Sequence, residues 1–226
     1  MKTVLVVAAH PDDEVLGCGG TIVKWVREGA QVYTLIFGEG PWSRYSDRAE
    51  GFGQADVQQV STFTAEAARI LGTTETFTFK FPDNQFDRVP LLDLVKTVED
   101  IKARVRPDVV LTHSRADLNI DHQLTYRAVL TACRPHPEET VREIYSFEIP
   151  SSTEWNYPQA FQPNYFVNIG VALDQKIAAL RCYATEMKAF PFPRSEEALR
   201  AIAMRWGSVA GMSAAEAFEV IRIREV

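Results

Sequence analysis

A short run near the start of the chain combines one histidine with three acidic residues, Ala9-His10-Pro11-Asp12-Asp13-Glu14. A second run far along the chain, Asn119-Ile120-Asp121-His122, adds another histidine and another acid. The first run directly follows an apolar stretch, where unpaired charge at the edge of a core is costly. Imidazole and carboxylate groups are ligands of Zn²⁺, and a bound cation would compensate this charge. The two runs together therefore predict a metal site.

Both histidine-bearing runs follow stretches of apolar and β-branched residues, which are typical of central strands in a parallel sheet. Residues 3–9 lead into His10, and residues 108–112 lead into His113 and then His122. In an open α/β sheet the carboxyl ends of such strands face one crevice. We therefore expect His10, Asp13 and His122 to converge on a metal ion, and we expect Asp12 to act as general base on a metal-activated water.

Each of these polar residues also has a purely structural interpretation. Asp12 or Asp13 can cap the helix that is predicted to begin at Glu14, and Asp121 can cap its own helix. His136 lies between two prolines, away from any motif, and is expected at the surface. Three acids and one histidine within five residues nevertheless exceed what a single helix cap requires.

Helical and strand-like patterns alternate along the chain. They predict the α/β class, with a Rossmann-like, mostly parallel sheet flanked by helices and an active site at the carboxyl ends of the strands. Three glycines in the first helix lack the spacing of a phosphate-binding loop and instead indicate close helix packing. The predicted strands are 3–9, 31–38, 76–81, 108–112, 141–148, 165–169 and 214–224. The predicted helices are 14–28, 56–71, 90–106, 121–132, 174–187 and 196–206, and loops are expected at 39–53 and 150–163.

Composition narrows the class of protein. The 226 residues fit a single domain, 1–226, and the net charge of −6 argues against a nucleic-acid-binding surface. The three cysteines are widely spaced and read as reduced thiols of a cytoplasmic protein. The apolar start is expected to be a buried strand and not a signal peptide, because charged residues follow it at once. No stretch has the roughly 18 apolar residues that a membrane span needs.

The motifs resemble one family closely. The run 9–14, followed by Leu16-Gly17-Cys18-Gly19-Gly20, resembles the signature of the LmbE-like (PIG-L) zinc-dependent N-deacetylases. Asp121-His122 falls where that family has its second metal motif, and Arg205-Trp206-Gly207 resembles part of its common ending. The resemblance covers nearly the whole chain. Residues 81–86 and 113–122 most resemble members linked to surface-polysaccharide biosynthesis.

The resemblance implies a hydrolase that removes the acetyl group from an N-acetylated amino sugar, such as an N-acetylglucosamine conjugate linked to a nucleotide, a lipid or another aglycone. By this resemblance His10, Asp13 and His122 are the ligands of Zn²⁺ or of another divalent ion such as Fe²⁺. Asp12 matches the general base, and Asp121 matches a carboxylate that supports the ligands. Members of the family often self-associate, so a homo-oligomer is expected.

One departure from the family pattern concerns the acid that the reaction needs. The family's first histidine in the second motif is replaced here by Asn119. An amide can donate a hydrogen bond to an oxyanion but cannot transfer a proton. We expect His113 to take over the proton transfer, or else Asp12 to return the proton to the amine. A family arginine also lacks a clear match, and Arg48 is our candidate for a substrate contact.

Two other functions are compatible with the sequence. His10 and Asp12 with the distant His122 have the spacing of an Fe(II) facial triad, although such sites occur on barrels or sandwiches of short strands. A sugar-binding protein that keeps the fold without turnover is the second alternative, and the replacement by Asn119 makes it relevant.

Overall fold

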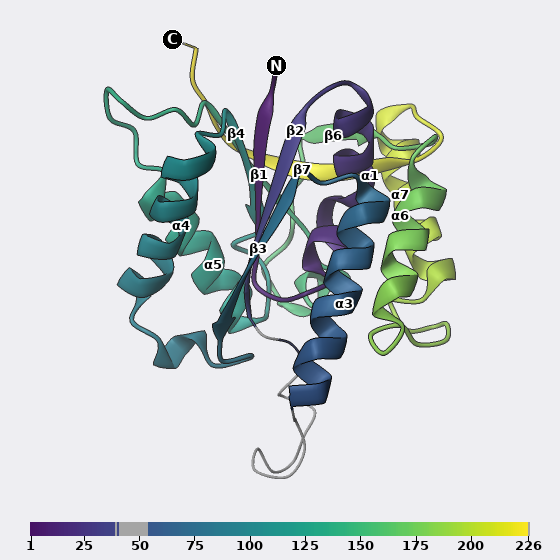
Figure 1. Cartoon of the computed structure of the whole chain (residues 1–226). Coiled ribbons are helices and arrows are strands. Elements are labelled where there is room, and N and C mark those ends of the chain that lie inside the picture. The colour runs from purple at the N-terminus through teal and green to yellow at the C-terminus, as the bar shows by residue number, and fades with distance from the viewer. Residues whose placement is uncertain (39, 41–53, 226) are drawn as a thin grey trace.

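The computed structural model describes residues 1–38, 40 and 54–225, and side chains at all of these except 54–57. A seven-stranded sheet is sandwiched between two layers of helices (Figure 1). The strands are β1 (Thr3–Ala8), β2 (Gln31–Gly38), β3 (Glu75–Phe81), β4 (Val109–His113), β5 (Glu143–Phe147), β6 (Tyr165–Asn168) and β7 (Ala215–Ile223). The α-helices are α1 (Asp13–Arg27), α3 (Gln54–Leu71), α4 (Leu91–Val105), α5 (Ile120–Ala132), α6 (Leu173–Leu180) and α7 (Glu196–Ala210). Short 3₁₀ helices are η2 (Phe86–Arg88), η3 (Thr153–Trp155) and η4 (Arg181–Tyr183).

The strand order is β3-β2-β1-β4-β5-β7-β6, and the pairs from β3 to β5 are parallel. Among the strands that the structure describes, the antiparallel pairs are β5 with β7 and β6 with β7. The chain winds outwards from β1 in one direction and from β4 in the other, so the sheet reverses its order between these two strands. Such a switch point opens a crevice at the carboxyl ends of the strands.

Alternate residues of the central strand face opposite layers, as the pleat of a strand requires. Val4 and Val6 of β1 belong to the hydrophobic core on the side of α1, α3, α6 and α7, whereas Leu5 and Val7 belong to the core on the side of α4 and α5. Figure 1 shows these two helix layers on opposite sides of the sheet. Within the described part of the chain, no helix combines the length and apolar character that crossing a membrane would demand.

The predicted α/β class and mostly parallel sheet are confirmed, with boundaries that shift by a few residues. One predicted helix is wrong: α6 ends at Leu180 and, after η4, the chain continues to Ser195 without helix, so 174–187 is not one helix. A contact explains the break, because the Tyr183 hydroxyl turns inward and donates to Glu14 Oε1 at 2.8 Å. The predicted loop 150–163 is only partly exposed, since Ser152 and Thr153 are buried. The predicted loop 39–53 lies, except for residue 40, outside the described residues.

Candidate active site

Three potential metal ligands meet at the switch point of the sheet. His10 follows β1, Asp13 begins α1, and His122 lies in the first turn of α5, which follows β4. His10 Nδ1 lies 3.4 Å from Asp13 Oδ2 and 3.3 Å from His122 Nε2. Asp13 Oδ2 and His122 Nε2 are themselves 3.4 Å apart. The three atoms form a nearly equilateral triangle. The structure thus brings together the three residues that the sequence singled out.

The backbone at the end of β1 separates the two aspartates. Asp12 has φ +102°, in the left-handed region that non-glycine residues rarely adopt, and its side chain does not cap α1. Asp13 Oδ2 instead accepts from the His10 backbone N–H at 2.8 Å. Asp13, and not Asp12, therefore faces both imidazoles, which removes the basis for a facial triad of His10, Asp12 and His122.

Carboxylates also contact the outer nitrogen of His10. Its Nε2 lies 2.9 Å from Asp121 Oδ2 and 3.2 Å from Asp83 Oδ1. The other oxygen of Asp121 accepts from the Phe86 N–H of η2 at 2.9 Å. A carboxylate behind a ligating histidine fixes the orientation and tautomer of its ring. Asp121 occupies that place for His10, and the cap of α5 is Asn119, whose Oδ1 accepts from the Asp121 N–H.

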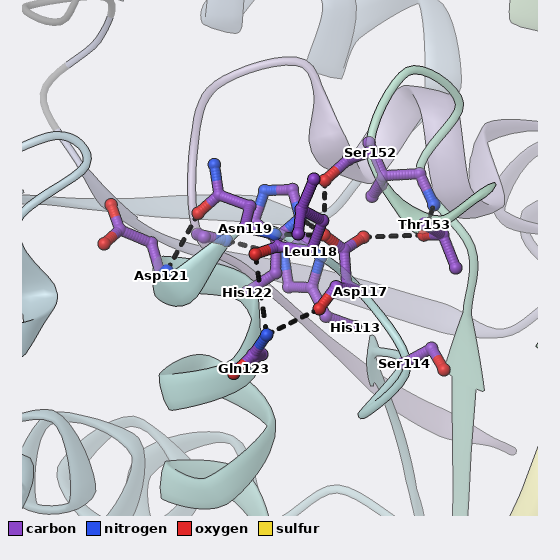
Figure 2. Close-up of polar contacts among 12 residues, drawn as sticks. His113, Ser114, Asp117, Leu118, Asn119, Asp121, His122, Gln123, Ser152 and Thr153 are labelled. Carbon is purple, nitrogen blue, oxygen red and sulfur yellow. Dashed lines mark hydrogen bonds and ion pairs between the residues drawn. The ribbon is translucent and has the colours of Figure 1, made fainter. Parts of the chain in front are cut away.

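A second carboxylate, which the sequence analysis missed, lies behind His122. Asp117 Oδ1 is 3.0 Å from His122 Nδ1, and Asp117 is fully buried. The His113 ring stacks on the His122 ring with centroids 4.1 Å apart. His122 is thus held between a carboxylate and an aromatic plane (Figure 2).

His113 itself is not placed for proton transfer to a substrate. It has no exposed surface, and its Nε2 accepts the Ala9 backbone N–H at 2.9 Å. Burial lowers the pKa of His113 to about 3, so the ring is neutral. We therefore correct the expectation for His113: it supports the His122 ring from behind, away from the cavity described below. Arg48, the expected substrate contact, lies outside the described residues.

Asp12 faces an arginine from a distant part of the chain. Arg194 Nη1 donates to Asp12 Oδ2 at 2.7 Å, and the backbone N–H of Asp12 donates to Glu14 Oε2 at 3.1 Å. Burial raises the pKa of the Asp12 carboxyl to about 7, while the Arg194 charge opposes this rise. A carboxyl with a pKa near neutrality suits a group that must both take and release a proton.

The pKa values of His122 and Asp117 are shifted by burial and by the neighbouring charges. Burial alone would lower the pKa of His122, but Asp13 and Asp117 outweigh it and raise the value to about 9. Burial alone would raise the pKa of Asp117, but His122 and the hydrogen bonds from Ser152 and Thr153 bring it down to about 2. The site is therefore a compact group of opposite charges, in which a cation could replace the protons of the imidazoles.

A cavity of about 240 Å³ opens next to the three ligands. Asp12 and Asn119 both face it, and Asn119 Nδ2 donates to Asn84 Oδ1 at 2.9 Å. Part of the wall comes from residues 185–194 after η4, of which only 185–187 fall within the predicted helix 174–187. Other lining residues are His10, Pro11, Gly40, Val60, Phe63, Asp83, His122, Ser151, Ser152, Tyr183, Thr185, Glu186, Lys188, Phe192 and Arg194. A potential base, a potential oxyanion donor and the two histidines of the ligand triangle thus line one small cavity.

Comparisons with known proteins agree with this arrangement. The family profile of GlcNAc-PI de-N-acetylases (PIG-L) matches residues 5–133, and a profile of the MutS5 N-terminal domain matches residues 91–180, less than half of the chain. The uncharacterized deacetylase YaiS of Escherichia coli is 29% identical over 71% of this chain and 81% of its own. A 4-oxalmesaconate hydratase of Pseudomonas putida is 31% identical over 81% of this chain and 73% of its own.

Two further comparisons extend along nearly the whole chain. The diacetylchitobiose deacetylase of Thermococcus kodakarensis is 25% identical over 98% of this chain and 84% of its own. The solved structure of the N,N'-diacetylchitobiose deacetylase from Pyrococcus horikoshii superposes with a TM-score of 0.79 at 23% identity, covering 98% of this chain and 84% of that one. Since the matching profile spans more than half of the chain and contains all three ligands of the triangle, the chain belongs to the GlcNAc-PI de-N-acetylase (PIG-L) family.

Proposed function

We propose that this protein is a metal-dependent amide hydrolase that removes the acetyl group from an N-acetylated amino sugar. The observation that carries the proposal is the triangle of His10, Asp13 and His122 next to a cavity that His10, His122 and Asp12 line. The names of the relatives support the reaction class, since several are deacetylases of N-acetylated sugars. Acetate and a free amine are the products of adding water across the amide bond.

The donor set fits a small divalent cation. Asp13 Oδ1 is buried with no hydrogen-bond partner among the described residues, and the three donor atoms are 3.3 to 3.4 Å apart. The three atoms are close enough to bind one ion, and two imidazoles with one carboxylate are a donor set that Zn²⁺ uses in catalytic sites. Metal analysis would distinguish Zn²⁺ from Fe²⁺. Bound there, the ion would polarise the amide carbonyl and lower the pKa of a water to about 7.

The chain itself then handles the protons and the developing charge. Asp12 takes the proton from the attacking water as general base and returns it to the leaving nitrogen, since it lines the cavity while His113 is fully buried away from it. Arg194 holds the Asp12 carboxylate in place at 2.7 Å. Asn119 has a second hydrogen on Nδ2 that can donate to the oxyanion, while the first one bonds to Asn84.

The size of the cavity limits which part of a sugar conjugate can enter the site. A cavity of about 240 Å³ is smaller than the roughly 300–1,000 Å³ of sites that enclose a whole drug-sized ligand. We propose that it takes the N-acetylated sugar ring, of the N-acetylglucosamine type, while a nucleotide, lipid or other aglycone lies outside. We also propose, from the sequence alone, a single domain spanning 1–226, a homo-oligomer and a role in cytoplasmic steps of surface-polysaccharide synthesis.

The test is acetate release from a panel of N-acetylglucosamine conjugates by the metal-loaded protein, with and without chelator. We expect turnover that chelation abolishes and that added Zn²⁺ restores. Asp12→Asn should keep the metal but lower kcat by about 10²–10⁴, as loss of a general base does. His122→Ala should lose both metal and turnover. If the protein binds these sugars without releasing acetate, it is a sugar-binding member of the family and the proposal is wrong.

A second candidate is the addition of water to an unsaturated acid. It is favoured by the 31% identity to the 4-oxalmesaconate hydratase. The same ligands and Asp12 could activate water for that reaction, and Lys188 or Arg194 could bind a substrate carboxylate at the cavity wall. Loss of the ultraviolet absorbance of a conjugated unsaturated acid would reveal hydration, whereas acetate release would not accompany it. Activity in that assay alone would replace the deacetylase proposal by this one.

A further inference from the structure

The turn after β5 connects two parts of the site that are far apart in sequence. Its residues Pro150 to Thr153 lie beside the loop that carries Asp117 and Asn119 (Figure 2). Ser152 Oγ and Thr153 Oγ1 both donate to the Asp117 carboxylate, the latter at 2.6 Å. Ser152, Thr153 and Asp117 are all buried. The turn is therefore fixed to Asp117 from the inside of the molecule.

Asp117 contacts the ligand side of the site with the same carboxylate. Its Oδ1 lies 3.0 Å from His122 Nδ1 and accepts the Asn119 backbone N–H at 2.9 Å. One buried side chain thus orients a proposed metal ligand, the loop of the proposed oxyanion donor and the turn. A carboxylate used only to close a turn would not need the contact with the imidazole.

The opposite side of the turn holds Arg194. Ser151 has φ +73°, a left-handed conformation that is strained for serine, and this aims its Oγ at Arg194. Arg194 Nε donates to Ser151 Oγ at 2.7 Å and to the Pro150 carbonyl at 3.3 Å. These contacts leave Nη1 to reach Asp12 Oδ2 at 2.7 Å. Arg194 is thus held at the turn by its Nε atom and contacts the proposed catalytic carboxylate with its Nη1 atom.

We propose that the Pro150–Thr153 turn positions the Asp12 carboxylate through Arg194, and that Asp117 fixes this turn and the His122 ring together. Ser151, Arg194 and Asp117 are positioning residues in this scheme, since they act through Asp12 or His122. The inference rests on the proposed function, because it assigns Asp12 the part of general base. It predicts that damage to the turn lowers turnover without removing the metal.

The first experiment uses two variants of Ser151 that differ in the acceptor. Ser151→Gly removes Oγ but suits the positive φ, whereas Ser151→Asn also tolerates that φ and retains an acceptor oxygen. We expect Ser151→Gly to lower kcat by about 10- to 100-fold, the range that a small misplacement of a catalytic group costs. Its KM and bound metal should stay unchanged, and Ser151→Asn should recover part of kcat. Unchanged kcat in Ser151→Gly overturns the proposal.

The second experiment asks whether Ser151 acts through Arg194. Residues that act as a unit have non-additive effects on kcat. Ser151→Gly should therefore have almost no further effect in an Arg194→Met background, and Arg194→Lys should fall between Arg194→Met and the wild type. Arg200→Met, which removes a half-buried arginine that pairs with Asp174 and Glu196 and does not line the cavity, is the matched control with unchanged kcat. Additive losses in the double variant contradict the scheme.

The third experiment needs no turnover. Asp117→Asn should weaken Zn²⁺ binding by about 10- to 100-fold, as loss of a carboxylate behind a ligating histidine does, and Ser151→Gly should not weaken it. Crystal structures of the wild type and Ser151→Gly should show the Arg194–Asp12 pair intact in the first and broken in the second. If no substrate is deacetylated, the proposed function fails, while these two measurements still decide the positioning scheme. An intact pair in Ser151→Gly, or unchanged metal affinity in Asp117→Asn, overturns it.

Discussion

Asp12 and Asp13 are neighbours in the chain, yet their carboxylates contact different groups. The left-handed backbone of Asp12 turns its side chain towards Arg194 and the cavity, while Asp13 turns towards His10 and His122. Such a conformation costs roughly 1–3 kcal/mol and persists only where the surroundings impose it. The strain at Asp12 therefore separates the proposed base from a proposed ligand at adjacent positions.

Asn119 combines a structural and a proposed chemical role that mutation can separate. Its Oδ1 caps α5 and its Nδ2 faces the cavity. Serine is an equally good cap but has no amide donor. We expect Asn119→Ser to keep the thermal midpoint and to lower kcat by about 10²–10³, as loss of one oxyanion donor does. Asn119→Ala should lose kcat similarly and also about 1 kcal/mol of stability. If Asn119→Ser keeps the wild-type kcat, Asn119 is a cap and nothing more.

The residues that were predictable from sequence lie in two local motifs. His10, Asp13 and His122 were found because each follows a strand end within a compact polar run. Asp117 had a weak signal, an acid in the polar loop ahead of His122, that sequence reasoning passed over. Arg194 had none, since its contact with Asp12 exists only after the chain has folded. The misjudged role of His113 has the same origin: being next to a strand end does not reveal which face of the sheet the ring joins.

At the scale of elements, α1 contacts the sheet so closely that it requires glycine. A Cβ built at Gly17 would lie 2.2 Å from Phe147 Cδ2, and one at Gly20 would lie 2.8 Å from Ile169 Cγ2. Both partners are fully buried. This confirms the predicted close packing of the glycine-rich helix and excludes a phosphate loop there.

Gly17→Ala should destabilise the protein because the added methyl must displace the Phe147 ring. We expect a loss of about 1–3 kcal/mol, the usual cost of overpacking a core, measured by urea unfolding. Phe147→Leu makes room, so the double variant should lose less than the sum of the single losses. Strict additivity would mean that the two side chains do not compete for the same space.

A buried ion pair joins α1 to α6 and β7. The helix breaks at Cys18, with φ −148°, and the Gly20 and Thr21 N–H groups donate to Glu216 at 2.9 and 2.7 Å. Lys176 Nζ neutralises Glu216 at 2.6 Å and donates to the Leu16 carbonyl at 2.8 Å. Glu216 therefore replaces the backbone acceptors that the break in α1 removes.

Lys176→Met should be far more damaging than loss of a surface lysine. It leaves the Glu216 charge buried without a partner, which costs about 3–5 kcal/mol. Adding Glu216→Gln should restore part of that loss, because the amide oxygen still accepts from α1. Lys96→Met, which removes an exposed lysine that pairs with the half-buried Glu99, should leave the unfolding midpoint unchanged. Equal effects of the two lysine variants would refute a structural role for the pair.

Element prediction failed where a tertiary contact overrides local preference. The stretch after Leu180 has a helical pattern as far as Met187, but Tyr183 turns inward to Glu14 and the chain then forms the cavity wall. The sheet order was predictable only in part: alternating strands and helices imply the parallel pairs, whereas nothing in the C-terminal strands indicates that β7 inserts between β5 and β6.

At the scale of the whole molecule, the sheet brings two distant halves of the chain to one point. The carboxyl ends of β1 and β4 are neighbours in the sheet. His10 and His122 therefore meet, although most of the residues that the family profile matches lie between them in the sequence. No segment forms the site alone. Metal binding should therefore stabilise the complete fold and not one local element, since the ion binds only the folded arrangement.

This coupling gives a pH-dependent prediction for stability. The pKa of His122 rises to about 9 in the metal-free fold, above its value of about 6.5 in an unfolded chain. A raised pKa contributes stability that is complete below pH ~6.5 and disappears as the pH rises through ~9. Metal binding has the opposite trend, because the ion needs deprotonated imidazoles. The gap in Tm between the Zn²⁺-loaded and chelator-treated protein should therefore widen from pH 6.5 to pH 9.

The concentration of Zn²⁺ relative to its Kd sets the size of this gap in Tm. Zn²⁺ at about 1,000 times its Kd adds about 4 kcal/mol, which corresponds to about 8–16 °C for a protein of this length. Thermal unfolding at half-unit steps of pH, in the presence of Zn²⁺ or chelator, measures it. His136→Ala removes an exposed imidazole outside the site and should leave the gap and its pH dependence unchanged. A gap that stays constant with pH would mean that His122 keeps no proton in the metal-free fold, and that the carboxylates of Asp13 and Asp117 do not act on it as the distances imply.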